Sequence, residues 1–202
     1  MSALKELKQF KQFKENYQFN QKIIEEIDGK EYCEGYPLIN NEGKTIGECE
    51  KWINAGYNNE GSVAKVLSNL FPYKFKFRGK KLNSIETFFQ GIKFKDINMQ
   101  NYIFEYSGLD SNRVKACNDY DWKNTGKLYW QGKEIDRYSK EYENIVDEMY
   151  ICAIQNPLYR NALKKCEKYI MHSIGDKEKS ETVFTRYEFE KELNCLKDFL
   201  KR

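Results

Sequence analysis

Three side chains of the types used in catalysis follow one another at helical spacing: Glu86, Gln90 and Lys93. At positions i, i+4 and i+7 they share one face of a helix, beside an apolar stripe that would bury that helix against a core. A carboxylate, an amide and an amine in a row next to a buried face are typical of an active site. The alternative is ordinary helix chemistry: with Asn83 as N-cap, Glu86 completes a capping box and Lys93 is a solvated charge.

The flanking residues predict the elements that hold this group. Residues 73–78 alternate ring side chains with basic ones, the period-two pattern of a half-buried strand. Residues 79–81 form a turn signal, and the helix should then begin at Asn83 or Ser84, both good N-caps. The sequence therefore places the helix directly after a short strand and a turn.

Positive charge is concentrated in the same region. Between Lys74 and Lys95 the chain has seven basic residues and one acid, Glu86, although its net charge is only +3. Such a stretch attracts anions such as phosphate or pyrophosphate. For any single lysine the alternative is a solvated strand face.

Composition favours one globular domain in the cytoplasm. The chain has 202 residues, of which 32% are charged and 40% hydrophobic, and its 13 Phe, 15 Tyr and 3 Trp can build a core rich in rings. No stretch approaches the ~18 apolar residues of a membrane span, and the N-terminus lacks a signal-peptide core.

Six scattered cysteines without a Cys-x-x-Cys pair and a single histidine predict free thiols and no structural zinc. We expect no metal and no cofactor.

Apolar periodicity and turn signals give the order of elements, with no internal repeat. Residues 30–66 and 118–126 should be loop-rich. Residues 172–175 should interrupt the regular secondary structure before a polar loop at 176–180. Helices are predicted at residues 3–28, from 83 or 84 on, at 96–106, 111–117, 139–155 and 157–169, and after an N-cap at Thr185.

The same residues resemble the NADAR superfamily of YbiA-like proteins. The resemblance runs from about residue 30 to the end, in ordered blocks that are more specific than one short motif. The blocks are 67–72 (LSNLFP), 84–90 (SIETFFQ), 93–94 (KF), 127–132 (KLYWQG), 136–142 (DRYSKEY), 172–175 (HSIG) and 181–185 (ETVFT).

The resemblance implies cleavage of an N-glycosidic bond, either in ribosylamino intermediates of riboflavin synthesis or between ADP-ribose and guanine in nucleic acid. Such a reaction passes through an oxocarbenium-like state, which needs negative charge or a base near C1 and a proton for the leaving nitrogen. Glu86 matches the glutamate of the family motif and takes the carboxylate role. Lys93 matches the lysine of the family motif. It either binds a phosphate or fixes the charge of Glu86. Alternatively, if burial lowers the pKa of Lys93, its amine attacks C1 of the opened ribose ring and forms a Schiff base.

Further residues are expected to bind the substrate. Asn69 and Gln90 would hydrogen-bond ribose hydroxyls, Trp130 in a polar turn would stack a base for ~1–3 kcal/mol, and Arg137 would grip a phosphate bidentately. His172 is either a ligand contact or a structural hydrogen bond. The full set is Asn69, Phe71, Arg78, Phe89, Gln90, Trp130, Arg137, Tyr138, His172, Ser173, Gly175 and Thr182.

One departure from the family decides between the two substrates. Short YbiA-like members have an Asp followed shortly by Trp-Gly in the C-terminal third, and a tryptophan on the helix after the middle loop. This chain has neither, and Glu141 or Tyr142 stands near the second position. ADP-ribose chemistry, described for longer branches, is therefore the stronger expectation.

The sequence thus predicts an α+β fold, a mostly helical single domain with a small antiparallel sheet. Residues 1–29 would be an N-terminal helical segment and residues 30–202 a NADAR-like domain. The expected function is hydrolysis of ADP-ribosylated guanine in nucleic acid, with that nucleic acid or ADP-ribose as the partner and no membrane. The alternatives are an N-glycosidase acting on ribosylamino-pyrimidine phosphates and a non-catalytic module that binds ADP-ribose or another NAD derivative.

Overall fold

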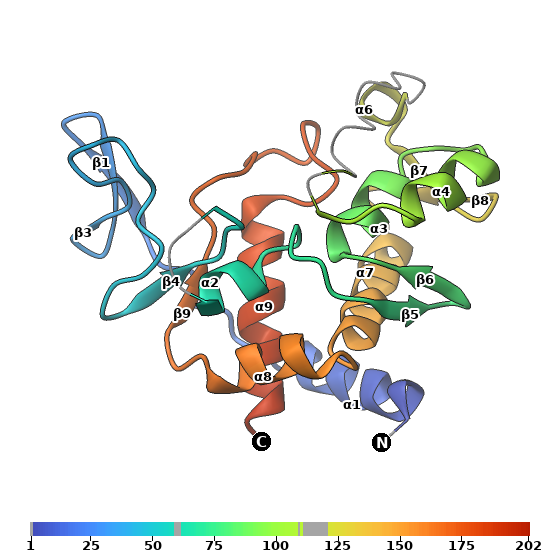
Figure 1. Ribbon diagram of the computed structural model, residues 1–202, viewed down its shortest axis with the longest axis horizontal. Helices are drawn as coiled ribbons and strands as arrows, with labels where there is room; N and C mark the ends of the chain where they lie inside the picture. Colours follow the sequence, from blue (N-terminus) through green and yellow to red (C-terminus); the bar gives the residue numbers. More distant parts are fainter. Residues whose placement is uncertain (1, 59–61, 109, 111–120) are drawn as a thin grey trace.

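The computed structural model of the chain describes residues 2–58, 62–108, 110 and 121–202. Helix α9 (Arg186–Leu200) runs through its middle, with small sheets on either side (Figure 1). The helices described around it are α1 (Ala3–Glu15), α2 (Ser62–Leu67), α3 (Ile85–Gly91), α4 (Ile97–Phe104), α6 (Trp122–Thr125), α7 (Lys140–Ala153) and α8 (Pro157–Lys165).

The strands form small, separate sheets. A three-stranded antiparallel sheet contains β1 (Ile24–Ile27), β2 (Lys30–Cys33) and β3 (Tyr36–Pro37), and β4 (Trp52–Asn54) pairs in parallel with β9 (Tyr169–Met171). Two antiparallel hairpins are β5 (Phe75–Phe77) with β6 (Lys80–Leu82), and β7 (Lys127–Trp130) with β8 (Lys133–Asp136). The predicted α+β class is confirmed. Its strands, however, form several small sheets rather than one antiparallel sheet, and the pair of β4 and β9 is parallel.

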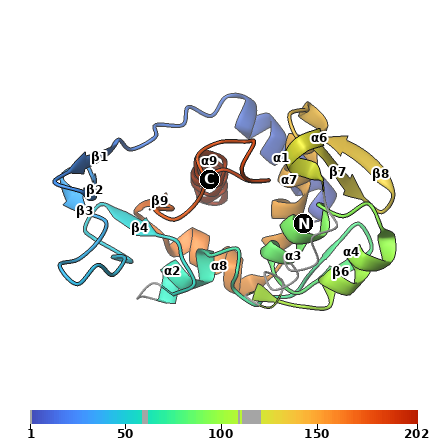
Figure 2. The same ribbon diagram turned by 90° about the horizontal axis from the view of Figure 1, so that it is seen from above.

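The N-terminal segment differs from the prediction. Helix α1 ends at Glu15, so the helix expected over residues 3–28 is wrong beyond that point. Residues 16–23 lead from α1 to β1 on the far side of α9 (Figure 2). Asp28 and Gly29, with φ of 52° and 72°, form the turn between β1 and β2. The division expected after residue 29 therefore falls inside a hairpin, because Asp-Gly favours a two-residue hairpin turn as readily as a helix end.

Later elements follow the sequence more closely. The Ser139 hydroxyl caps α7 by accepting from Tyr142 N, and Thr185 caps α9 in a reciprocal box with Glu188. Helix α8 stops at Lys165, earlier than predicted, and α6 lies within the stretch expected to be loop. The helix expected at 111–117 lies outside the described residues.

A cluster of rings fixes the position of α3. The Trp130 ring lies 4.7 Å from Phe77, 5.4 Å from Phe104 and 5.9 Å from Phe88, measured between centroids. These rings come from β7, β5, α4 and α3, so one cluster joins both hairpins to two helices. Rings at 4.5–7 Å in tilted and edge arrangements are favourable beyond the apolar area that they bury.

Gly91 permits the close packing of α3 on α4. A Cβ added to Gly91 would lie 2.4 Å from Phe104 Cε1. We therefore expect Gly91→Ala to lower the free energy of unfolding by ~1–3 kcal/mol, the usual cost of overpacking. A thermal melt should show a drop of ~2–4 °C per kcal/mol for a chain of this size. Adding Phe104→Leu to the variant should restore part of the loss, and an unchanged melting temperature would contradict this packing.

Candidate active site

A cavity of about 610 Å³ lies where α3 meets several loops. Its walls come from residues 56–58, from the turn 68–70 after α2, from α3 and α6, and from the two loop segments 172–176 and 181–186. This volume suits a nucleotide-sized ligand. The predicted site residues that line it are Asn69, Glu86, Phe89, Gln90, Lys93, His172, Gly175 and Thr182.

The start of α3 excludes the capping-box explanation of Glu86. Ser84 is the N-cap, and its hydroxyl accepts from Thr87 N at 3.3 Å. The Asn83 amide instead donates to two backbone carbonyls at the end of α4, at 3.2 and 2.8 Å. Glu86 is therefore the second residue of the helix rather than the third, where a capping-box acid stands.

Glu86, Gln90 and Lys93 form a hydrogen-bonded chain along the cavity wall. Gln90 Nε2 donates to Glu86 Oε1 at 2.5 Å, and Lys93 Nζ donates to Gln90 Oε1 at 2.9 Å. Glu86 is half-buried, whereas Lys93 is only 8% exposed. The amide thus lies between a carboxylate and an ammonium and orients both.

Asn69 is fixed against the same helix. Its carbonyl accepts from Glu86 N at 2.9 Å, and the Tyr150 hydroxyl donates to its Oδ1 at 3.0 Å. Burial raises the pKa of Tyr150 well above its ordinary value, so this hydroxyl keeps its proton. Because Tyr150 occupies Oδ1, the amide nitrogen is the group that Asn69 offers to a ligand.

His172 faces α3 across the cavity as a neutral ring. Its Nδ1 lies 2.7 Å from the Ala55 carbonyl, an acceptor, so Nδ1 carries the proton and Nε2 keeps a lone pair. Burial lowers the pKa of His172 to about 4; the bond to Ala55 opposes that shift and Arg186 adds to it. Gly175 makes room for the ring, because a Cβ there would lie 3.2 Å from His172 Cδ2.

An aromatic wall completes the cavity. The Phe184 ring stacks on Phe89 with centroids 4.7 Å apart and planes at 20°, and it is only half-buried. Sequence reasoning did not single out Phe184, although it stands inside the block 181–185. It also missed Tyr57 and Arg186, which no local pattern distinguishes.

Comparison with known proteins places the chain in a family. The family model described as bacteriophage protein GP30.3 matches residues 61–198. The chain belongs to this GP30.3 family. The family is of the NADAR type, which confirms the resemblance read from the sequence blocks.

Relatives of this GP30.3-family protein carry little functional description. A protein of Enterobacteria phage T4, described as an uncharacterized 17.1 kDa protein in the Gp30-rIII intergenic region, is 35% identical over 139 residues, which cover 67% of this chain and 90% of that protein. The NMR structure of E. coli YbiA has a TM-score of 0.49 at 15% identity, covering 76% of this chain and 86% of that one. That likeness does not extend to function or to individual residues. Family membership indicates a glycosidase-like function, without naming the bond or the substrate.

Several predicted binding residues of the GP30.3-family protein lie away from the cavity. Trp130 is the last residue of β7, and its ring points into the core with 6% exposed. The predicted stacking of a base on Trp130 is wrong, because alternation along β7 turns Leu128 and Trp130 inward and leaves Gln131 and Gly132 to form the turn.

Four others have structural partners or face solvent. Phe71 packs beside Tyr73, and Ser173 exchanges hydrogen bonds with the Asn54 side chain at 2.6 and 3.0 Å. Arg78 forms a bidentate pair with Glu148 at 3.0 and 2.7 Å on the outer surface. Tyr138 is exposed, and its ring covers Gly126. None of these four lines the cavity.

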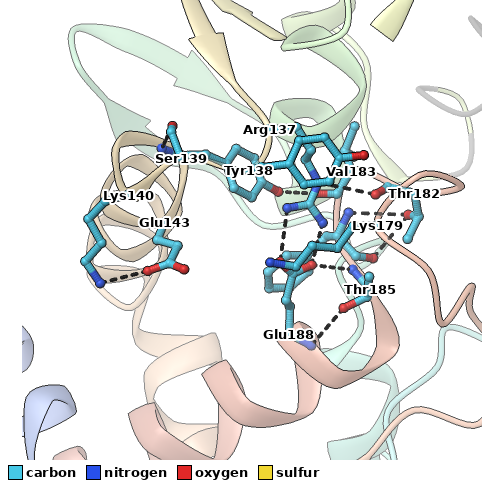
Figure 3. A network of polar contacts seen from close by, with 12 residues as sticks. Arg137, Tyr138, Ser139, Lys140, Glu143, Lys179, Thr182, Val183, Thr185 and Glu188 are labelled. Carbon is cyan, nitrogen blue, oxygen red and sulfur yellow. Dashed lines mark hydrogen bonds and ion pairs between the residues drawn. The ribbon is translucent and has the colours of Figure 1, made fainter. Parts of the chain in front are cut away.

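Arg137 cannot grip a phosphate as predicted, because the protein itself uses its guanidinium. Arg137 donates to both Glu188 oxygens at 3.0 and 2.6 Å and to the Thr182 carbonyl at 3.3 Å (Figure 3). Its side chain is fully buried. The pair holds the loop that carries Thr182 against the first turn of α9, and so fixes one wall of the cavity.

In the described part of the chain, no group of three or more His, Cys, Asp or Glu side chains is arranged to hold a metal ion. The helices described there are also too short or too polar to cross a membrane.

The pair of Arg137 and Glu188 gives a prediction about stability. Arg137→Met removes the buried guanidinium and leaves the Glu188 carboxylate with the half-exposed Lys179 ammonium at 3.5 Å and the Thr185 amide, so the free energy of unfolding should fall by ~3–5 kcal/mol, the usual cost of breaking a buried pair. Arg78→Met, which breaks the exposed pair with Glu148, should cost at most ~1 kcal/mol. Denaturant titration of both variants checks this, and equal losses would refute the structural role of Arg137.

The same loss should depend on pH. Burial opposes ionisation, but the bonds from Arg137 hold the pKa of Glu188 below its ordinary 4.5. A carboxylate whose pKa is lower in the folded than in the unfolded protein stabilises the fold at pH values above its unfolded pKa. That stabilisation is lost as the pH falls through its pKa in the folded protein. The difference in the free energy of unfolding between the wild-type protein and Arg137→Met should therefore be largest at pH 7 and should shrink below pH 4.5.

Proposed function

We propose that this protein hydrolyses the N-glycosidic bond between ADP-ribose and guanine in nucleic acid. The observation that supports it most is the chain of Glu86, Gln90 and Lys93 in the wall of a nucleotide-sized cavity. Ligand binding alone does not require a carboxylate and an ammonium oriented by one amide. Hydrolysis of a ribosyl–nitrogen bond requires both a base and an acid.

Each group has a defined role in this scheme. Glu86 takes a proton from a water molecule, whose oxygen forms the new bond to C1 of the ribose. The C1–N bond breaks, its electron pair stays on the guanine nitrogen, and the Lys93 ammonium supplies the proton for that nitrogen. Glu86 then releases its proton to water and Lys93 regains one, so that only water is consumed. The carboxylate also stabilises the positive charge that develops on the ribose.

The remaining cavity residues suit an ADP-ribosyl group. The Asn69 amide donates, and His172 Nε2 accepts, so together they complement ribose hydroxyls. The half-buried Phe184 ring offers a stacking surface for a base in place of Trp130. Arg186 is buried at the first turn of α9, where the helix dipole favours an anionic ligand. Glu190 at 3.5 Å and Glu31 at 3.8 Å offset part of its charge, while its Nη2 has no hydrogen-bond partner among the described residues and can donate to a ligand.

A first prediction concerns ligand binding. ADP-ribose should stabilise the fold, because its diphosphate and ribose groups match this cavity. At a hundredfold excess over the dissociation constant the gain is ~2.7 kcal/mol, and a thermal-shift titration measures it. A melting curve that is unchanged up to millimolar ADP-ribose would argue against the proposal.

A second prediction concerns Glu86. Glu86→Gln keeps the size of the side chain but removes the base, so the single-turnover rate on an ADP-ribosylated oligonucleotide should fall by ~10²–10⁴. The melting temperature should change little, because Ser84 rather than Glu86 caps the helix. ADP-ribose affinity should also stay close to normal, since the loss lies in the transition state.

Glu25→Gln provides the matched control, because Glu25 is exposed on β1 and far from the cavity lining. It should leave the rate unchanged. A near-normal rate for Glu86→Gln would end its catalytic role. Wild-type protein that binds ADP-ribose and releases nothing would be a binding module, and release only from ribosylamino-pyrimidine phosphates would point to the riboflavin-type reaction.

A further inference from the structure

A second depression lies between the β5–β6 hairpin and the end of α4. It measures about 540 Å³ and is lined by Lys74, Lys80 and Lys81 together with the amides of Asn83 and Asn101. Glu105 is the acid on its edge. We call this depression the lysine groove.

The lysine groove and the cavity share two segments of chain. Pro72 lines the groove and Leu70 the cavity, while Asn83 lines the groove and Glu86 the cavity. Residues so close in sequence are at most ~7 and ~11 Å apart even in extended chain. The linings of the two hollows therefore come close together at these two points.

Like charges face one another on the β5–β6 hairpin beside the groove. In the register of β5 and β6, Lys76 stands directly opposite Lys81, and both are exposed. Like charges in that position destabilise a strand pair. Within the described residues, no acidic side chain pairs with Lys74, Lys76, Lys80 or Lys81, whereas Lys127 and Lys133 of the neighbouring hairpin each have a glutamate partner. An external anion would remove the repulsion.

We propose that the lysine groove binds the phosphodiester backbone of a nucleic acid strand whose modified guanine enters the cavity. This inference rests on the proposed function for the group that enters the cavity, but not for the strand in the groove. Free ADP-ribose is accommodated by the cavity alone, so a basic groove beside it serves a ligand that extends further. Lysine ammonium and asparagine amide groups suit phosphate oxygens and do not read sequence.

The test uses a triple variant, Lys74→Gln/Lys80→Gln/Lys81→Gln, and a control with the same net charge, Lys5→Gln/Lys8→Gln/Lys164→Gln. The control lysines are exposed on α1 and α8 and do not line the groove. Fluorescence anisotropy measures the binding of an unmodified single-stranded DNA oligonucleotide at several salt concentrations. Since the substituted side chains of the groove are largely exposed, the melting temperature should stay normal.

The triple variant should bind ~10²-fold more weakly at low salt, and the slope of log K against log salt should fall by ~2, as three lost phosphate contacts imply for a single strand. The control should bind as wild type does. Equal weakening by the control, or no weakening by the triple variant, would overturn the proposal. So would lysine-dependent binding to phosphatidylserine vesicles without binding to the oligonucleotide.

This outcome is separable from the fate of the proposed function, because DNA binding requires no turnover. Lysine-dependent DNA binding together with a normal Glu86→Gln rate would leave the groove assigned and the catalytic scheme refuted. The converse result, cleavage that needs Glu86 but DNA binding that ignores the three lysines, would refute the groove and keep the reaction. ADP-ribose should stabilise the triple variant as much as the wild type, because its site lies in the cavity.

Discussion

The packing of α3 into the ring cluster is the constraint on which the site depends. One side of this short helix inserts Phe88 among Phe77, Trp130 and Phe104, and Gly91 lets it approach α4 closely. A helix of seven residues has too few hydrogen bonds to be stable alone. Tertiary packing therefore holds it, and the side opposite the rings presents Glu86 and Gln90 to the cavity, with Lys93 in the turn directly after the helix.

The wall of the cavity that faces α3 consists mostly of loop, so contacts other than helix packing stabilise it. There, polar groups replace ring packing: Arg137 binds Glu188 and the Thr182 carbonyl, His172 binds the Ala55 carbonyl, and Ser173 binds Asn54. Each contact joins segments that are distant in sequence. Partly buried hydrogen bonds of this kind are directional, so they fix the loop position more tightly than apolar contact alone would. The two walls together give a cavity with one side of packed helix, which carries Glu86 and Gln90, and one side of tethered loop.

The parts that could be predicted from the sequence were those encoded locally. The alignment of Glu86 and Gln90 follows from helical spacing, and the caps at Ser139 and Thr185 follow from their neighbours. The helix expected to carry Lys93 as well ends at Gly91, and Lys93 reaches Gln90 from the turn that follows. Failures arose where a distant partner decides. Arg137 has the chemistry of a phosphate ligand, but Glu188 occupies it from 51 residues away. Trp130 lies next to a polar turn, yet strand alternation directs its ring inward. Phe184 and Arg186 enter the site only because the loop before α9 folds back over α3, which no short pattern in the sequence shows.

The division of charge between the cavity and the lysine groove has a consequence for recognition. Inside the cavity, acidic and basic side chains both line the walls: Glu86 lies near Lys93, and Asp176 and Glu181 accompany Lys123 and Arg186. The lysines of the β5–β6 hairpin, which have no acidic partner in the part of the chain that the structure describes, lie outside, where solvent screening makes each contact weak but where several phosphates can be bound at once. An arrangement of this kind separates affinity for the strand from catalysis at the bond. Under the proposed function, changes in the groove would alter how often a modified guanine reaches the cavity, whereas changes on α3 would alter what happens to it there.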